Sequence, residues 1–173
     1  MDELLSERVP AERTQTLADA GNAEAQFSVG LRIANEGEVP DYLQAAQWYL
    51  KAADQSHPLA QFNLGLMYDR GQGVPHDPAL SMAWIGKAAN LGDAGAQYLL
   101  GMRQNRLSLA ETPELALESR IEAYKWLRLA AAQGYRDSGA GCDLVAMGMT
   151  REAVIEANRR TDAFVAGSIP ISK

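Results

Sequence analysis

A repeat of about 35 residues constrains this chain more than any other feature of its sequence. Residues 59–92 read LAQFNLGLMYDRGQGVPHDPALSMAWIGKAANLG, and related stretches stand directly before and after them. A unit of this length cannot bury its own apolar face, so it must stack on its neighbours to form a continuous core. We therefore expect a row of similar structural units.

Composition and periodicity indicate that these units are helical. Apolar residues recur at spacings of three and four, alanine is abundant, and β-branched residues are sparse between the turn-forming residues. The chain has 173 residues, of which 47% are hydrophobic and 22% charged, as in ordinary globular domains. The sequence predicts an all-α solenoid, an α-α superhelix of helix-turn-helix repeats with helical caps, that forms a single domain over residues 1–173.

Two sets of residues align the helices of successive units. The first helices align on glutamines that are 35 and 36 residues apart, namely Gln26, Gln61 and Gln97. The second helices align on tryptophans that are 36 and 42 residues apart, namely Trp48, Trp84 and Trp126. In the third unit Thr112 can serve as an N-cap and Pro113 as the first helical residue, so this second helix should be longer.

The alignment divides the chain into six segments. Residues 1–21 should form a helical cap that Pro10 interrupts, and the last eight residues should be a flexible tail. The three repeats are 22–56, 57–92 and 93–134, an altered repeat at 135–165 caps the C-terminal end, and the tail is 166–173.

Small residues recur at one position of the first helices. A glycine inside a helix costs about 1 kcal/mol relative to alanine, so its recurrence implies a packing advantage. Gly30, Gly65 and Gly101 should let the two helices of each hairpin approach closely, while the tryptophans fill the space between hairpins.

The central unit follows the pattern A-x-A-Q-x-x-L-G-x-x-Y-x-x-G-x-G-V-x-x-D-x-x-x-A-x-x-W-x-x-K-A-A-x-x-G, which resembles that of the Sel-one-like repeat family, relatives of the tetratricopeptide repeats. The matching residues are Ala60, Gln61, Leu64, Gly65, Tyr68, Gly71, Gly73, Val74, Asp77, Trp84, Lys87, Ala88, Ala89 and Gly92. The first unit departs from the pattern with Ile33 for tyrosine and Ser56 for glycine. The resemblance covers residues 22–160 and implies a bacterial α-solenoid that serves as a non-catalytic adaptor or scaffold.

Charge and cysteine content narrow the range of partners and compartments. The net charge of -6 weighs against nucleic acid or an anionic membrane as the main partner, because both favour a basic surface. The N-terminal residues lack the basic and apolar segments of a secretory signal, and no apolar run is long enough to span a membrane. With Cys142 as the single cysteine, we expect a cytoplasmic protein without an intrachain disulfide, and a monomer.

Residues that could support catalysis are few. The two histidines, His57 and His76, flank loops, and Cys142 lies in an apolar segment without a histidine nearby in the sequence. We interpret the histidines as loop or cap residues and the cysteine as a small buried side chain. No catalytic residue, metal site or cofactor site is predicted.

A recurring pattern on the first helices predicts a binding groove. The residues one, five and nine positions beyond each glutamine are mostly an aromatic, an aliphatic and a polar or basic residue, which suits an apolar-anchored peptide or helix with an acidic flank. They are Phe27, Leu31 and Asn35; Phe62, Leu66 and Arg70; and Tyr98, Met102 and Arg106. For the aromatic residues, packing between helices is an equally weighted alternative.

The leading functional hypothesis is therefore a protein or peptide partner held on the concave surface. One alternative is β-lactam binding or hydrolysis, which is linked to cysteine-rich members of the family, although this chain lacks their cysteine pairs. Another is an immunity or inhibitor protein that masks a secreted toxin.

Overall fold

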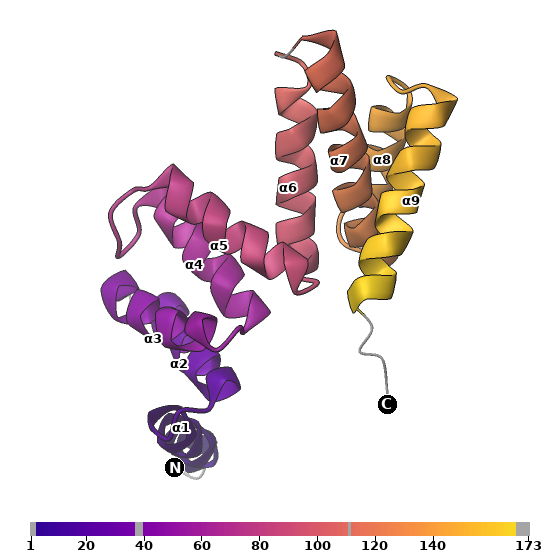
Figure 1. Cartoon of the computed structure of the whole chain (residues 1–173). Coiled ribbons are helices and arrows are strands. Elements are labelled where there is room, and N and C mark those ends of the chain that lie inside the picture. Colours follow the sequence, from indigo (N-terminus) through magenta and orange to yellow (C-terminus); the bar gives the residue numbers. More distant parts are fainter. Residues whose placement is uncertain (1–2, 37–39, 111, 169–173) are drawn as a thin grey trace. The chain divides into compact units, whose positions relative to one another are not determined.

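The computed structural model describes residues 3–36, 40–110 and 112–168, and within these ranges the regular structure is helical throughout, without strands (Figure 1). This confirms the all-α prediction. In chain order the helices are α1 (Glu3–Asp19), α2 (Ala23–Asn35), α3 (Tyr42–Asp54), α4 (Pro58–Arg70), α5 (Pro78–Asn90), α6 (Ala94–Leu107), α7 (Pro113–Ala132), α8 (Ser138–Ala146) and α9 (Arg151–Ser168).

The chain divides into two compact units, residues 1–88 and 89–173, with the boundary inside α5. In the first unit α2 packs against α1 and α3, and α3 packs against α4. In the second unit α7 packs against α6, α8 and α9. Each unit is described by itself, and the single-domain organisation stays a prediction.

The recurring glycines lie where the two helices of each hairpin come closest, as predicted. A Cβ atom on Gly65 would lie 2.7 Å from Cγ1 of Ile85, and one on Gly101 would lie 2.6 Å from Cγ of Leu127. A Cβ atom on Gly30 would lie 2.9 Å from the ring of Tyr49. The residue after each tryptophan therefore fills the space that the glycine leaves.

The tryptophans are less buried than the sequence suggests. Trp126 is 9% exposed, but Trp48 and Trp84 are only half-buried. Each indole carries a lysine ammonium over its face, at 3.9 Å for Lys51 over Trp48 and 3.8 Å for Lys87 over Trp84. The prediction that all three tryptophans fill the core is thus wrong for the first two, which pack against core residues with part of each ring exposed.

The three aligned glutamines are structural. In each case Nε2 donates a hydrogen bond to a carbonyl near the end of the preceding helix, over a distance of 2.9–3.1 Å. The pairs are Gln26 with Ala18, Gln61 with Ala53 and Gln97 with Ala89. Because Ala18 accepts in the same way as the two later alanines, α1 occupies the place of a second helix in front of α2.

The α1 helix departs from the sequence prediction at Pro10. The helix continues through this proline from Glu3 to Asp19 and then turns at Gly21, which has φ +96°. A proline inside a helix removes one backbone donor and crowds the carbonyl four residues earlier, which can interrupt a helix, but the helix is continuous here. The predicted interruption is therefore wrong.

Two glycines and an aspartate shape the loop between α4 and α5. Gly71 ends α4 in the left-handed region, and Asp77 Oδ1 accepts hydrogen bonds from the backbone N–H groups of Ala79 and Leu80 at 2.9 Å. Gly73, with φ +70°, brings the loop against the start of α3, since a Cβ atom there would lie 2.1 Å from the carbonyl oxygen of Tyr42.

The second unit has the predicted longer helix and a different C-terminus. The α7 helix has 20 residues, whereas α3 and α5 each have 13. The α9 helix continues to Ser168, so the predicted flexible tail is wrong for residues 166–168. The rest of the predicted tail, residues 169–173, lies outside the described part of the chain. Arg160 of α9 forms ion pairs with Glu118 and Glu122 of α7 and with Glu156 of its own helix.

Candidate functional site

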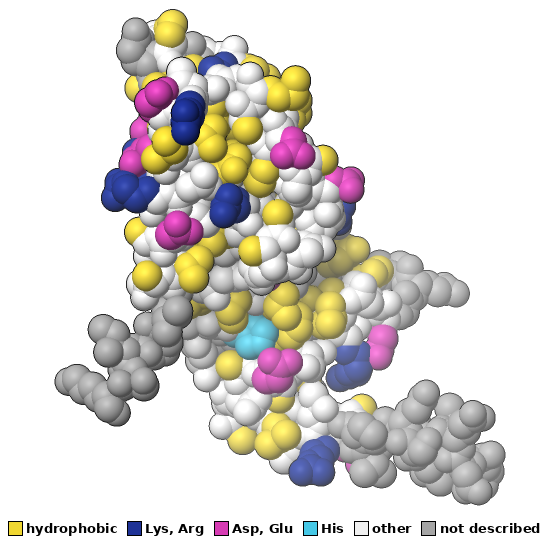
Figure 2. All heavy atoms as spheres, turned by 90° about the vertical axis from the view of Figure 1, so that its right-hand side faces the viewer, with side chains coloured by type: hydrophobic (Ala, Val, Ile, Leu, Met, Phe, Trp, Pro, Cys, Tyr) yellow, Lys and Arg dark blue, Asp and Glu magenta, His cyan; other side chains and the backbone are white. Residues whose placement is uncertain are grey.

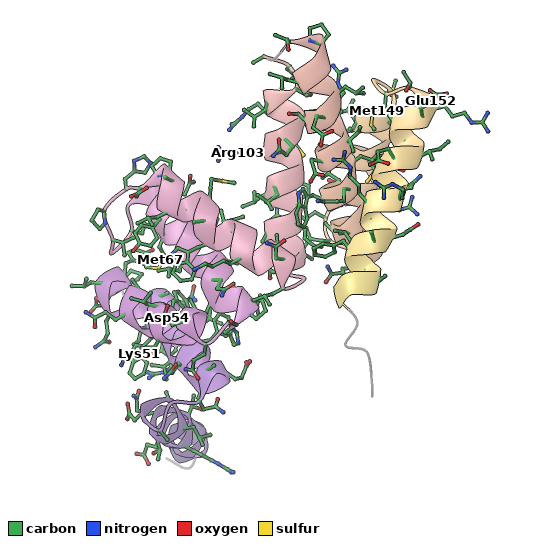
Figure 3. All side chains as sticks on the ribbon, viewed as in Figure 1. Lys51, Asp54, Met67, Arg103, Met149 and Glu152 are labelled. Atoms are coloured by element: carbon green, nitrogen blue, oxygen red, sulfur yellow. The ribbon has the colours of Figure 1, made fainter. Side chains whose placement is uncertain are left out.

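A pocket of about 230 Å³ lies in the first unit and is lined by residues of α2, α3, α4 and the loop after α4. Six of its ten described lining residues are apolar or aromatic, while more of its exposed surface is polar than apolar. Met67, labelled in Figure 3, contributes from α4 and is 5% exposed. The other apolar or aromatic lining residues are Leu31, Ala34, Tyr42, Tyr49 and Leu66.

The remaining lining residues are polar and carry hydrogen-bond donors. They are Asn35, Asn63, Arg70 and Gln72. The amide Nδ2 of Asn35 donates to the carbonyl of Leu31 at 2.6 Å, and that of Asn63 donates to the carbonyl of Leu59 at 2.9 Å. Each side-chain amide therefore keeps one N–H group and its oxygen free of these intrahelical bonds.

Arg70 gives the pocket its charge. It is the one charged residue in the pocket lining, it is exposed, and it forms no ion pair with any residue that the structure describes. By contrast, Arg32 pairs with Glu36 at 3.2 Å on the same unit. The pocket thus combines an apolar wall with an unpaired cation.

Tyr49 contributes a neutral phenol to the same pocket. Burial raises the pKa of this side chain to about 12, because the charged phenolate would lose its hydration. The residue is 2% exposed, and its ring also packs over Gly30. Near neutral pH its hydroxyl is protonated and can donate a hydrogen bond.

Four of the nine residues predicted for the groove come together at this pocket. Leu31 and Asn35 contribute from α2, and Leu66 and Arg70 contribute from α4. Phe27 requires a correction, because it is only 8% exposed and stacks on the ring of His57 at a centroid distance of 4.8 Å. Its side chain packs in the core and is not available to a partner.

The other four predicted residues lie outside the pocket lining. Phe62 is half-buried on α4. Tyr98, on α6 of the second unit, packs against Tyr135 with ring centroids 5.6 Å apart. Met102 and Arg106 are exposed on the same helix. Within the described residues, Tyr98 therefore follows the packing alternative, and a partner role for Met102 and Arg106 stays a prediction.

Sequence reasoning missed four pocket residues with polar or aromatic side chains, namely Tyr42, Tyr49, Asn63 and Gln72. Asn63 carried a usable signal, because it precedes Met67 by four positions and Arg70 by seven and so lies on the same helical face. Tyr42 and Tyr49 belong to a second helix and Gln72 lies in a loop, so none of the three is part of the first-helix pattern.

Of the residues considered for catalysis, His57 caps a helix and Cys142 lies where burial disfavours its thiolate. The His57 Nδ1 atom accepts a hydrogen bond from the backbone N–H of Ala60 at 3.2 Å, and its Nε2 atom lies 2.9 Å from a carboxylate oxygen of Glu24. Burial raises the pKa of the Cys142 thiol to about 11, so little thiolate forms near neutral pH. In the described part of the chain, no group of three or more His, Cys, Asp or Glu residues could hold a metal ion.

Among the described helices, none is both long enough and apolar enough to cross a bilayer. On the face shown in Figure 2, Lys and Arg side chains are interspersed with Asp and Glu side chains and do not gather into a basic patch.

Comparison with known proteins gives relatives for part of the chain. It is 33% identical over 81 residues to the ERAD-associated E3 ubiquitin-protein ligase component HRD3A of Arabidopsis thaliana, a match that covers 46% of this chain and 12% of that protein. It is 37% identical over 68 residues to the chitin synthase regulator SKT5 of Saccharomyces cerevisiae, with 39% and 10% covered. The chain thus matches only about a tenth of the length of these curated relatives.

Solved structures match over more of the chain. One is a protective antigen present in uropathogenic Escherichia coli strains that displays an SLR fold, with a TM-score of 0.74, 25% identity, and coverage of 92% of this chain and 33% of that one. Another is a Sel1 repeat protein from Oxalobacter formigenes, with a TM-score of 0.61, 33% identity, and coverage of 76% and 96%. These neighbours share the solenoid fold predicted from the sequence.

The repeats themselves decide the family. The sequence profile of the Sel1 repeat matches residues 23–57, 58–93 and 94–135, which together make up more than half of the chain. The described helices α2 to α7 supply one hairpin for each of these three matches. The chain therefore belongs to the Sel1 repeat family.

Proposed function

We propose that this protein is a non-catalytic adaptor that holds a segment of a partner protein in the pocket between α2 and α4. The observation that carries the proposal is the pocket itself, in which Leu31 and Leu66 of two successive repeats stand beside the unpaired Arg70. Apolar anchors beside a charged group are typical of surfaces that bind protein segments.

The relatives support this class of function. One is named as a component of a ubiquitin ligase and another as a regulator of chitin synthase, and both names describe roles exercised together with other proteins. The settings of His57 and Cys142 favour the same class, since the histidine caps α4 and burial disfavours the thiolate.

Affinity capture from the native cell, followed by mass spectrometry, tests the proposal. The double variant Leu66→Asp and Arg70→Glu places negative charge in the pocket and should abolish capture of the specific partner. Its matched control is Met102→Asp with Arg106→Glu, at the equivalent positions of the third repeat, which should retain most of the capture. A partner that is captured equally well by the pocket variant and by the unaltered protein would refute the assignment of this pocket.

A further inference from the structure

The donors around the pocket make it a site for an anion. The chain carries 22 acidic and 16 basic residues, yet among the described residues the lining contains Arg70 and no acidic residue. An exposed guanidinium without a partner among the described residues attracts a carboxylate, with which it can form two parallel hydrogen bonds.

Neutral donors reinforce this preference. Tyr49 forms no hydrogen bond with another residue in the described part of the chain, so its hydroxyl can donate to a bound group. Asn35 and Asn63 each use one amide hydrogen for a carbonyl of their own helix and keep the second. The pocket thus offers more donors than acceptors.

The volume suits a small occupant. At about 230 Å³ it is smaller than the roughly 300–1,000 Å³ of sites that enclose a drug-sized molecule. The apolar wall from Leu31, Leu66 and Met67 and the Arg70 guanidinium belong to this one space. An internal Asp or Glu needs a neighbouring residue to supply the apolar side chain, whereas a C-terminal aliphatic residue carries both groups itself.

Building on the proposed function, we propose that the pocket holds the C-terminal residue of a partner chain, an aliphatic residue such as leucine. Its side chain contacts the apolar wall of Leu31, Leu66 and Met67. Its free carboxylate accepts hydrogen bonds from Arg70, with Tyr49 and the two asparagine amides as further donors.

N-acetyl-L-leucine carries both groups in the arrangement of a C-terminal residue, and N-acetyl-L-leucinamide is its uncharged counterpart. Both are titrated into the full ¹⁵N-labelled chain and followed by amide chemical shifts. We expect N-acetyl-leucine to shift the backbone amide signals of residues 31–35 and 63–72. N-acetyl-leucinamide should bind about tenfold more weakly, because the charge-assisted hydrogen bonds are lost.

Variants assign the preference to the guanidinium. Arg70→Gln should remove the roughly tenfold preference for the carboxylate, and Arg70→Lys should retain part of it, since lysine keeps the charge but not the planar fork. Arg106→Gln, on the exposed equivalent position of α6, is the matched control and should behave like the unaltered chain. Because Arg70 is exposed, thermal melting of these variants should match that of the parent.

Three results would overturn the inference. Equal binding of N-acetyl-leucine and its amide would show that the carboxylate plays no part. Tighter binding of acetyl-leucyl-glutamate amide, which carries only a side-chain carboxylate, would assign the site to an internal acidic residue. If partner capture depends on Leu66 and Arg70 but N-acetyl-leucine does not bind, the C-terminal assignment fails while the adaptor function stands.

Discussion

Replacing Gly73 with alanine tests the contact that joins the α4–α5 loop to α3. Gly73 has φ +70°, and a Cβ atom there would lie 2.1 Å from the carbonyl oxygen of Tyr42 and 2.6 Å from the backbone nitrogen of Leu43. Real Cβ contacts essentially never fall below 3.0 Å. Because the opposing atoms are backbone, no side-chain rotation relieves the overlap, and the loop or the start of α3 must move by about 1 Å.

The expected loss of stability has two parts. Alanine in the left-handed region costs about 1–2 kcal/mol. Overpacking that forces a backbone shift costs about 1–3 kcal/mol more, so Gly73→Ala should lose roughly 2–5 kcal/mol in total. Gly71→Ala is the matched control in the same loop, since its φ is +65° but its nearest contact would be 3.3 Å, from His76 Cβ. It should lose only the first part.

Urea unfolding of the two variants measures this difference. The free energies of unfolding of the two variants should differ by about 1–3 kcal/mol. In a chain of this size each kcal/mol lowers the melting temperature by about 2–4 °C. The displacement should also weaken binding of N-acetyl-leucine, because Tyr42 and Gln72 line the pocket. Equal free energies of unfolding for Gly73→Ala and Gly71→Ala would refute the close approach of the loop to α3.

Four further variants and one chemical probe test other parts of the structure. Ser56→Gly should raise the free energy of unfolding by about 1 kcal/mol in a urea titration, because Ser56 has φ +62° where glycine is unstrained. Gly86→Ala should stabilise the fold by up to about 1 kcal/mol, because this helical position has open space around its Cβ. Gly65→Ala should destabilise the fold, because its Cβ would overlap Ile85. Melting temperatures that shift in the same direction for both variants would contradict this. Arg160→Ala should cost about 1 kcal/mol, less in high salt, as the ion pairs between α7 and α9 are lost. Cys142, whose pKa is raised to about 11, should react slowly with a thiol reagent at pH 8 and faster in urea or as the pH rises toward 11; equal rates in buffer and urea would contradict its burial.

The fold was predictable because its determinants are local and repeated. The period of the glutamines and tryptophans aligned the helices, and the close approach at Gly65 and Gly101 followed from the cost of glycine in a helix. The start of α5 followed from an Asp-Pro pair that caps a helix regardless of its surroundings. Trp48 was misjudged because its burial depends on how completely neighbouring helices cover it, which a repeat pattern does not specify.

The candidate site was only half predictable, for a geometric reason. Residues four apart in an α-helix differ by about 40° around the axis, so positions one and nine beyond a glutamine differ by about 80°. Phe27 therefore faces His57 and Tyr49, whereas Asn35, eight residues later, reaches the pocket. The predicted groove residues of α2 therefore do not share one face. Phe27 packs in the core, whereas Leu31 and Asn35 line the pocket.

Positions that differ between repeats contribute to the chemistry of the pocket. At the position two residues after the aligned glutamine, the three repeats carry Ser28, Asn63 and Leu99. Of these three residues only Asn63 lines the pocket. The recurring residues are committed to packing, since Gly65 lies against Ile85 and the amide of Gln61 donates to a carbonyl of the preceding helix. Substitutions at the packing positions alter the scaffold as a whole, whereas Asn63 and Arg70 can change without affecting it. We therefore expect partner choice in this chain to depend on such variable positions of the first helices.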